Sequence, residues 1–314
     1  MIDGGVVLAV DLGATNLRLA LADHSGRILV RRRASTVGVR DPEVVVRMIQ
    51  EAARELLEEA GLDRGSLRAA GVGSPGVTDV DRGVVIATSY LLGWRDVPLR
   101  EYLETALGVP AVVDNDVNLA ALGEARAGAG RTVDDFVFLA IGTGVGAGVV
   151  LNRRLHRGSA WTAGEIGYLL VPGTSESSVA RGEPGALEAL VGGEGISQRW
   201  RQRWSTAQTR VPQCATATEI LDAARTGDTA AFETLHAAAR VLSYAIYDMA
   251  LILNCPLFVL GGSVGLHPAL RESVVELLAK RDTRVQPRIE RSRLGDDAQI
   301  TGAIYLALDR AEWG

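Results

Sequence analysis

The sequence predicts an α/β fold built from two related domains, and two observations support that prediction. Strand-like apolar runs alternate with segments of helical spacing along the chain, which is typical of layered α/β proteins. One strand-turn-strand unit also occurs twice, as VLAVDLGATNLRLALA at residues 7–22 and as VFLAIGTGVGAGVVLN at residues 137–152. Because a unit repeated in both halves suggests two domains that face each other, we expect the two turns to line a cleft.

The composition agrees with a two-domain globular protein. The chain has 314 residues, 47% of them hydrophobic and 23% charged, and this length suits two domains of roughly 100 to 200 residues each. The net charge of −5 gives no reason to expect nucleic acid as a partner, because a phosphate-binding face needs clustered Lys and Arg. The basic run from Arg31 to Arg33 is short, and we interpret it as a solvated strand edge.

Cysteine usage and the apolar segments indicate the compartment. Cys214 and Cys255 lie in unrelated contexts without metal-ligand spacing, so a reducing, cytoplasmic setting fits best. The N-terminal segment MIDGGVVLAV lacks the regions of a signal peptide. The apolar stretch 136–151 is Gly-rich and shorter than the roughly 20 residues that a membrane helix needs. We therefore expect a cytoplasmic protein with no membrane partner.

The first half predicts the element order βββ, α, β, α, β. Short turns join its first three strands, which indicates an antiparallel meander. Asp41 supplies an N-cap and Pro42 a first-turn proline for a helix whose apolar residues keep helical spacing until Gly61. The expected strands are 6–10, 17–23, 27–35, 69–74 and 111–115, with a loop at 75–83.

The second half continues the alternation of strands and helices after the repeated strand-turn-strand unit. Its apolar spacing predicts helices at about 217–226, 229–253, 268–280 and 298–311, and a strand at 256–262.

The turn DLGAT, residues 11–15, contains residue types that suit a phosphate site. Gly13 permits a tight turn and the close approach of a ligand, and Thr15 offers a hydroxyl and a backbone donor. Asp11 offers oxygens that Mg²⁺ or its water shell prefers. A plain hairpin turn is the alternative interpretation.

A second glycine-rich turn, GTGVGAG at residues 142–148, fits the same chemistry. Its closely spaced glycines leave backbone N–H groups free to face an anion. Gly142, Gly144 and Ala147 also match the dinucleotide pattern G-x-G-x-x-A, but that pattern must open a helix. The following VVLNRRL is β-branched and strand-like, so we exclude a dinucleotide site, and the absence of G-x-x-x-x-G-K-[ST] excludes a P-loop.

The segment VVDNDVNLAALGEA places Asp114, Asn115 and Asp116 at the end of a strand and the head of a helix. The helix dipole favours a negative charge there. One interpretation is that Asp114 or Asp116 only caps the helix. The other is that a carboxylate beside an amide accepts the proton of a substrate hydroxyl.

Two further segments combine apolar residues with unusual positions. AGEIGYLLVPG, residues 163–173, is interpreted as a buried strand with its turn, except that Glu165 must find partners or remain wet. FVLGGSVG is a strand that ends in Gly261 and Gly262, over which a flat base can lie.

In this order, the motifs resemble those of sugar kinases of the hexokinase, actin and Hsp70 superfamily, and more closely those of the ROK family. DLGATNLRLALAD is similar to the first phosphate motif, GSPGVTD to the sugar loop, NDVNLAALGE to the catalytic segment, GTGVGAGVVLN to the second phosphate motif, FVLGGSV to the adenosine motif and RLGDDAQITGAIYLAL to the C-terminal segment. The resemblance implies two ribonuclease H-like (actin-like ATPase) domains with an interdomain cleft. Residues 1–115 with about 300–314 would form a small α/β domain, and 116–299 a large one.

The resemblance also implies a reaction, the ATP- and Mg²⁺-dependent phosphorylation of a sugar hydroxyl, in which positioning and charge neutralisation dominate. Asp116 matches the family's general base, Asn115 matches a sugar ligand, and Asp11 would orient Mg²⁺ through water. The other implied positions are Gly73, Glu165 and Glu188 for the sugar, and Gly13, Ala14, Thr15, Asn16, Gly142, Thr143, Gly144, Gly261 and Gly262 for the nucleotide. A homodimer is implied as well.

The chain departs from the family where a structural zinc is usually held by one His and three Cys. Tyr168 replaces the His, and Val179, Arg181 and Ala186 replace the Cys residues. Since zinc needs imidazole or thiolate ligands, we expect no zinc here. The family His also contacts the sugar, so its loss leaves the substrate open; Tyr168 either supplies a hydroxyl or only packs.

Several functions remain open at this point. Glucose is the first candidate substrate, and amino sugars or ketoses such as N-acetylglucosamine, N-acetylmannosamine or fructose are alternatives. A family regulator would carry a helix-turn-helix before the first phosphate motif, and the position of Asp11 leaves no room for one. A non-catalytic sugar-binding protein is disfavoured by Asp116, and acetate-kinase-like or phosphate-hydrolysing chemistry is disfavoured by NDVN and GEIG together.

Overall fold

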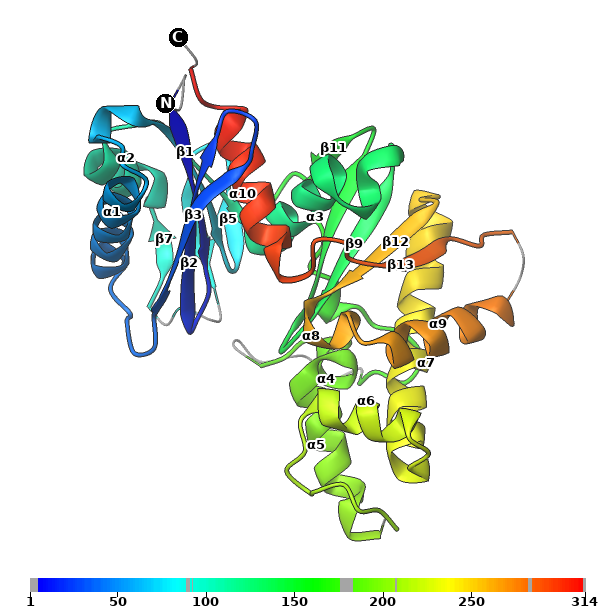
Figure 1. The fold of residues 1–314 in the computed structure, drawn as a ribbon. Helices are drawn as coiled ribbons and strands as arrows, with labels where there is room; N and C mark the ends of the chain where they lie inside the picture. The colour runs from blue at the N-terminus through cyan, green and yellow to red at the C-terminus, as the bar shows by residue number, and fades with distance from the viewer. Residues whose placement is uncertain are drawn as a thin grey trace. The chain divides into compact units, whose positions relative to one another are not determined.

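The computed structural model describes residues 5–88, 91, 93–175, 183–206, 208–281 and 284–312. By their contacts, these residues form two compact units (Figure 1). Unit 1 comprises Met1–Gly128, Arg157–Ala163 and Asp297–Gly314, and unit 2 comprises Ala129–His156 and Gly164–Asp296. The domain boundaries expected after residue 115 and near residue 300 stay a prediction.

Unit 1 contains a five-stranded mixed sheet in the order β3-β2-β1-β4-β8. The first three strands pair antiparallel, which confirms the predicted meander, while β1, β4 and β8 run parallel. The strands are β1 (Val6–Leu12), β2 (Asn16–Asp23), β3 (Ile28–Ser35), β4 (Leu67–Ser74) and β8 (Ala111–Asn115). Arg31 to Arg33 lie on β3, an edge strand of this sheet, as expected for a solvated strand edge.

Both faces of this sheet are covered by helices, so its central strands read as continuous apolar runs. Alternate residues of β1 enter two different cores: Leu8 and Val10 pack with α1 (Pro42–Glu59) and α2 (Leu99–Leu107), whereas Val7 and Ala9 pack with α3 (Asp116–Ala127) and α10 (Ala298–Leu308). This alternation follows from the two-residue period of a strand.

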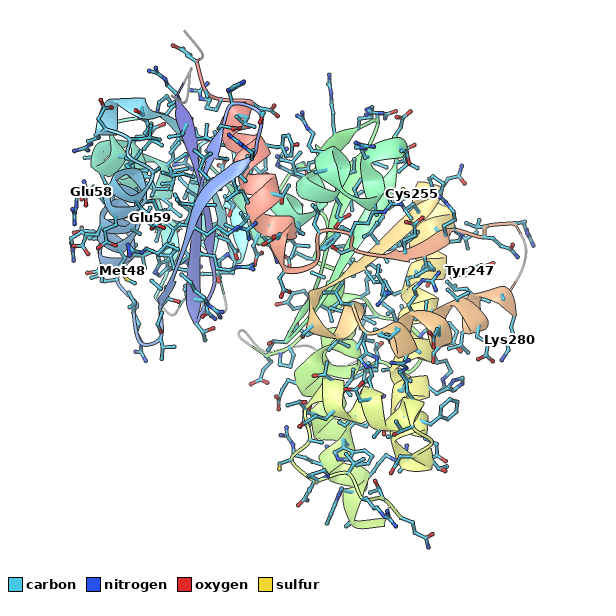
Figure 2. All side chains as sticks on the ribbon, viewed as in Figure 1. Met48, Glu58, Glu59, Tyr247, Cys255 and Lys280 are labelled. Atoms are coloured by element: carbon cyan, nitrogen blue, oxygen red, sulfur yellow. The ribbon has the colours of Figure 1, made fainter. Side chains whose placement is uncertain are left out.

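Helix α1 begins as predicted. The Asp41 side chain accepts a hydrogen bond from the Glu43 backbone N–H at 2.9 Å, and Pro42 occupies the first turn. The apolar face of α1 is buried against the sheet, and Glu58 and Glu59 point away into solvent (Figure 2).

A small second sheet in unit 1 corrects the predicted loop at 75–83. Residues Val77–Asp79 form β5, which pairs with β6 (Val84–Ala87), and β6 pairs with β7 (Arg95–Val97). The prediction was wrong here because these strands are only three or four residues long, too short for a period-two pattern to be distinct from a loop.

Three glycines let α10 approach its neighbours at backbone distance. A Cβ on Gly302 of α10 would lie 1.8 Å from the Leu119 carbonyl oxygen of α3. On the facing elements, a Cβ on Gly123 would lie 2.3 Å from the Ala298 carbonyl oxygen, and one on Gly71 of β4 2.1 Å from the Ala303 carbonyl oxygen. Only glycine fits at such positions, so this packing fixes α3 relative to the sheet.

Unit 2 is built on a second five-stranded mixed sheet, in the order β11-β10-β9-β12-β13. Antiparallel pairing joins β9 to β10, and parallel pairing joins β9, β12 and β13. The strands are β9 (Phe136–Ile141), β10 (Val145–Leu151), β11 (Arg154–His156), β12 (Leu257–Gly261) and β13 (Arg288–Arg291). The segment after GTG is therefore a strand, which confirms the exclusion of a dinucleotide fingerprint.

The helices of unit 2 share one large apolar core with its sheet. The fully buried Trp200 belongs to this core, and its indole N–H donates to the Pro212 carbonyl at 2.8 Å. The helices are α4 (Glu188–Val191), α5 (Gly193–Arg203), α6 (Ala217–Arg225), α7 (Thr229–Leu253), α8 (Gly262–Gly265) and α9 (Pro268–Ala279). The long helices 217–226, 229–253 and 268–280 were predicted. Helix α5, with 11 residues, was not predicted, and α4 and α8 are single turns that no periodicity could show.

The strand expected within AGEIGYLLVPG is not present. Residues Ile166–Tyr168 form a 3₁₀ turn, and Leu170 is 65% exposed. The prediction was wrong because a short apolar run does not distinguish an extended strand from another buried conformation. Among the described residues, no helix is long and apolar enough to cross a membrane.

The glycine contact between α10 and α3 can be tested by adding one methyl group. Gly302→Ala should lower the free energy of unfolding by about 1–3 kcal/mol, because a Cβ has no space against the Leu119 backbone. The adjacent Thr301→Ala, on a half-buried position of the same helix, serves as the control in urea titrations. An increase in stability for Gly302→Ala, as expected in an open helix, would contradict the close contact.

Candidate active site

The carboxyl ends of three parallel strands of unit 1 place the candidate polar residues in one row. Asp11 of β1 is in register with Gly73 of β4, and Gly73 is in register with Asp114 of β8. One residue further along, Ser74 is opposite Asn115. The carboxyl edge of a parallel sheet is where α/β folds bind ligands, so the topology brings together the predicted phosphate and catalytic segments of this unit.

Asp114 is fully buried and has a complete set of partners. Its Oδ2 accepts two hydrogen bonds from the Arg157 guanidinium, from Nε at 2.9 Å and from Nη2 at 2.6 Å. Its Oδ1 accepts from the Asn115 backbone N–H at 2.8 Å and from Asn118 Nδ2 at 3.1 Å. Such pairing is what allows a carboxylate to remain inside a protein.

Asn115, rather than either aspartate, caps helix α3. Its side-chain oxygen accepts from the backbone N–H groups of Val117 at 2.8 Å and Asn118 at 3.1 Å. Its Nδ2 donates to the Gly76 carbonyl at 3.0 Å, which ties the GSPGVTD loop to the helix start. The cap-only interpretation of Asp114 and Asp116 therefore does not account for them, because the cap is supplied by the residue between them.

Asp116 is the first residue of α3 and is half-buried. Its Oδ1 accepts from the Val117 backbone N–H at 2.9 Å, and the positive end of the helix dipole favours its carboxylate form. A Cβ on Gly73 would lie 3.5 Å from the Asp116 Cα and 3.0 Å from Leu119 Cδ1. Gly73 thus lies against the first turn of α3, where its lack of a side chain leaves room for that turn.

Asp11 has a partner, Arg18, that the DLGAT motif does not indicate. It is 8% exposed, and Arg18 of the neighbouring strand β2 contacts its Oδ2 through Nε at 2.7 Å and Nη2 at 2.5 Å. Burial raises the pKa of the Asp11 carboxyl, and the Arg18 charge and hydrogen bonds oppose that rise. Asp11 and Arg18 are direct partners in the β1–β2 register, next to the pair Leu12 and Leu17. The register of the predicted hairpin could therefore have indicated this ion pair from the sequence.

The turn between β1 and β2 presents its outer residues to solvent. The Gly13 backbone N–H donates to the Asn16 carbonyl at 2.8 Å, which closes the turn, and the Gly13 carbonyl accepts from the Thr36 hydroxyl at 2.9 Å. Ala14 and Thr15 are exposed. This arrangement suits a ligand that approaches backbone donors from outside.

The corresponding turn of unit 2, Gly142 to Gly144, is closed by a 3.0 Å hydrogen bond from the Gly142 N–H to the Gly144 carbonyl. The start of α5 lies against it: the Gly193 N–H donates to the Gly142 carbonyl at 2.7 Å, and a Cβ on Gly192 would lie 2.8 Å from the Thr143 carbonyl oxygen. A Cβ on Gly142 would meet no atom within 4 Å among the described residues. That open space is available to a phosphate group, so the turn fits the nucleotide that the resemblance implies.

Gly261 and Gly262 have internal packing roles. A Cβ on Gly261 would lie 2.3 Å from the Phe138 ring, and one on Gly262, where φ is +77°, would lie 2.5 Å from the Ile141 carbonyl oxygen. Packing alone therefore explains why both positions are glycine, and their proposed contact with an adenine base stays a prediction.

Two carboxylates of unit 2, Glu165 and Glu188, lie close enough to repel each other. Glu165 precedes the 3₁₀ turn and is exposed, so of the two alternatives that the sequence left open its carboxylate remains in contact with solvent. The surrounding protein atoms, and then the Glu188 charge, raise the pKa of Glu165. Glu188 begins α4, and its Oε2 accepts from the Val145 backbone N–H at 2.8 Å, directly after the Gly142–Gly144 turn.

Tyr168 belongs to the same cluster. Its side chain is 53% exposed, so it does not pack in the core. Burial of the phenol by nearby protein, followed by the charges of Glu165 and Glu188, raises its pKa. Of the two roles left open by the sequence, this environment favours a hydroxyl that can donate to an acceptor beside the carboxylates.

The structure describes only some of the positions at which the family usually has its zinc ligands. Val179 and Arg181 lie outside the described residues, and Ala186 is buried. Within the described ranges, no cluster of three or more His, Cys, Asp or Glu side chains could hold a metal ion. The absence of zinc stays a prediction based on the ligand chemistry of the sequence.

The ROK family profile matches residues 7–310. The glucokinase of Thermotoga maritima is 30% identical over 97% of this chain and 98% of its own length. The N-acetylmannosamine kinase of Salmonella typhi is 30% identical over 96% and 97%, respectively. A xylose repressor of Caldicellulosiruptor bescii is 24% identical over 98% of this chain and 79% of its own length.

A solved structure is similar over nearly the whole chain. It is a ROK family glucokinase from Streptomyces griseus in complex with glucose and AMPPNP, with a TM-score of 0.81 at 28% identity, and the match covers 97% of this chain and 100% of that one. The two five-stranded mixed sheets are consistent with two actin-like ATPase domains, as the sequence predicts.

The raised pKa of Glu165 has a consequence for stability. A carboxyl whose pKa is higher in the folded than in the unfolded state stabilises the fold at low pH, and this contribution is lost as pH rises through the folded pKa. Glu165→Gln should therefore raise the melting temperature at pH 7, and the gain should disappear near about pH 4. The exposed Glu272→Gln on α9 is the control, and an equal gain at both pH values would contradict the assignment.

Proposed function

Because this chain belongs to the ROK family, we propose that it is an ATP-dependent kinase that phosphorylates a hydroxyl of a hexose, with glucose as the first candidate. The main support is the placement of Asn115 and Asp116 at the start of α3, beside the row of residues at the carboxyl edge of the first sheet. That edge supplies a carboxylate, an amide and an open turn, which are the groups this transfer requires.

In the proposed reaction, Asp116 is the general base. Its carboxylate accepts the proton of the sugar hydroxyl as that oxygen attacks the γ-phosphorus of ATP, and ADP leaves with the electron pair of the broken P–O bond. The positive end of the helix dipole favours a negative charge at this position. The second Nδ2 hydrogen of Asn115, beyond the one donated to the Gly76 carbonyl, can orient the same sugar.

Glu165 and Glu188 are the proposed acceptors for other sugar hydroxyls. Two neighbouring carboxylates that repel each other are stabilised when hydroxyl donors are placed between or beside them. Tyr168 can donate to a ring or hydroxyl oxygen of the sugar at the same place. A polyol is therefore a better ligand for this cluster than an anionic substrate.

ATP and Mg²⁺ are the proposed cofactors. Bound Mg²⁺ would neutralise phosphate charge during the transfer. Asp11 would orient it through water, the turns at Gly13 to Asn16 and Gly142 to Gly144 would hold phosphates, and Gly261 with Gly262 would lie near the adenosine. The buried, acid-lined end of β1 and the open space at Gly142 support this assignment.

N-Acetylmannosamine is the second candidate substrate, because a kinase for that sugar is as similar in sequence as the glucokinases. The matched repressor keeps a regulatory, sugar-binding role as the alternative to catalysis. A cytoplasmic homodimer is part of the proposal through the family resemblance.

A coupled assay of ADP release with Mg-ATP, over glucose, N-acetylmannosamine, N-acetylglucosamine and fructose, tests the proposed reaction. Asp116→Asn should lower kcat by at least about 10²-fold while the protein stays folded, because the amide oxygen can still accept from Val117 but cannot take up a proton. Asp134→Asn, at a 67% exposed side chain of a surface ion pair, is the matched control. Absence of turnover with every sugar would refute the kinase function, and normal turnover by Asp116→Asn would place the base elsewhere.

The chain should contain no stoichiometric zinc when purified without added metal, since Tyr168 and Ala186 offer neither imidazole nor thiolate. Elemental analysis checks this directly. A chelator should leave the melting temperature unchanged; one zinc per chain, or a loss of stability on chelation, would contradict the prediction.

A further inference from the structure

The ion pair between Asp114 and Arg157 differs from the surface ion pairs of the chain. The Asp114 side chain is 0% exposed, whereas the acids paired with Arg153, Arg126 and Arg31 are 67%, 53% and 44% exposed. Surface pairs contribute little to stability, but a buried carboxylate depends on its partner, and removal of that partner is strongly unfavourable. The fork of Arg157, with Nε and Nη2 both on Oδ2, also restricts the orientation of the carboxylate.

The other oxygen of Asp114 transmits this orientation to the start of α3. Oδ1 accepts from the Asn115 N–H and from Asn118 Nδ2, while the Asn118 N–H is bound by the Asn115 side chain. Residues 114, 115 and 118 are thus linked by hydrogen bonds on both sides of Asp116. A shift of the Asp114 carboxylate would change the cap of the helix and, with it, the direction of the Asp116 side chain.

Arg157 lies in a segment with an unusual backbone. Residues Arg157–Ala163 group by contacts with unit 1, although the residues on either side of them group with unit 2. The Ala163 N–H donates to the Arg157 carbonyl at 3.1 Å, and the segment contains Trp161 at φ +61° as well as Gly158 at φ +72°. A bulky residue in the left-handed region costs energy and persists only where the surroundings hold it in place. The segment leads directly to Gly164 and Glu165.

We propose that Arg157 is a positioning residue for the general base. It holds the Asp114 carboxylate, which in turn fixes Asn115, Asn118 and the first turn of α3, so that Asp116 faces the sugar hydroxyl. The inference rests on the proposed kinase function for its effect on turnover. Its effect on the order of the α3 start does not depend on that function.

The kinetics of two variants and one control test the proposal. Arg157→Lys keeps the charge but loses the fork, and it should lower kcat about 10- to 100-fold with the KM for ATP changed by less than about twofold. The single variant Arg157→Gln leaves the buried Asp114 charge unpaired and can fail to fold. The double variant Asp114→Asn/Arg157→Gln avoids this problem because it removes both charges together. This double variant should unfold near the wild-type temperature and still show the reduced kcat. Arg153→Gln, at a 65% exposed arginine of the surface pair with Asp134, is the control and should keep wild-type kinetics.

Hydrogen exchange provides the readout that is independent of turnover. In Arg157→Lys, the Val117 and Asn118 amides, which donate to the Asn115 side chain, should exchange at least about tenfold faster, while amides of β9 and β12 keep their rates. Wild-type kcat in Arg157→Lys or in the double variant, or exchange that rises equally throughout the chain, would overturn the positioning role. If the wild type phosphorylates no sugar, the kinase function fails, and unchanged exchange at Val117 and Asn118 would separately refute the role of Arg157.

Discussion

The backbone contact between α10 and its two neighbours, α3 and β4, is the constraint on which unit 1 depends. Gly71, Gly123 and Gly302 remove the side chains that would separate these elements, so carbonyl groups pack against glycine backbone. Residues from opposite ends of the chain thereby share one core, in which Val7 and Ala9 lie with Ile300 and Ala303. Because α3 has little freedom in this packing, the site at its first turn is held from the interior as well as from the sheet edge.

The polar residues at the carboxyl edge of the sheet, which lie at the start of α3, each have a different role. Asp114 is buried and fully hydrogen-bonded, Asn115 caps the helix, and Asp116 is the half-buried carboxylate at the edge. Three consecutive polar residues therefore serve as anchor, cap and candidate base. The division follows from the strand-to-helix junction, which turns successive side chains in different directions, and it explains why a run of three is needed where a simple cap needs one residue.

In unit 2, a turn held by hydrogen bonds lies near two carboxylates that repel each other, those of Glu165 and Glu188. The Gly142–Gly144 turn is held by the start of α5 and, through the Val145 N–H, by Glu188. The same Glu188 raises the pKa of Glu165. Glu188 is therefore a link between the candidate phosphate turn and the candidate sugar carboxylates, and hydroxyl donors that relieve the repulsion would also affect the residue that tethers the turn.

The sequence by itself determined the α/β class, the antiparallel meander, the long helices other than α5 and the segments on which the candidate site residues lie, because apolar periodicity and turn residues are local signals. It did not determine the partners of those residues. Arg157 was missed because an arginine in a loop has no pattern that names its acceptor, whereas the hairpin register of Asp11 could have indicated Arg18. The short strands β5 to β7 and the 3₁₀ turn at Ile166 are too brief to show a period. Among the three adjacent polar residues, Asn115 is the cap through local hydrogen bonds from Val117 and Asn118. Only the tertiary structure decided that Asp114 is the anchor, since its burial and its hydrogen bonds from Arg157 arise from contacts between segments far apart in the chain.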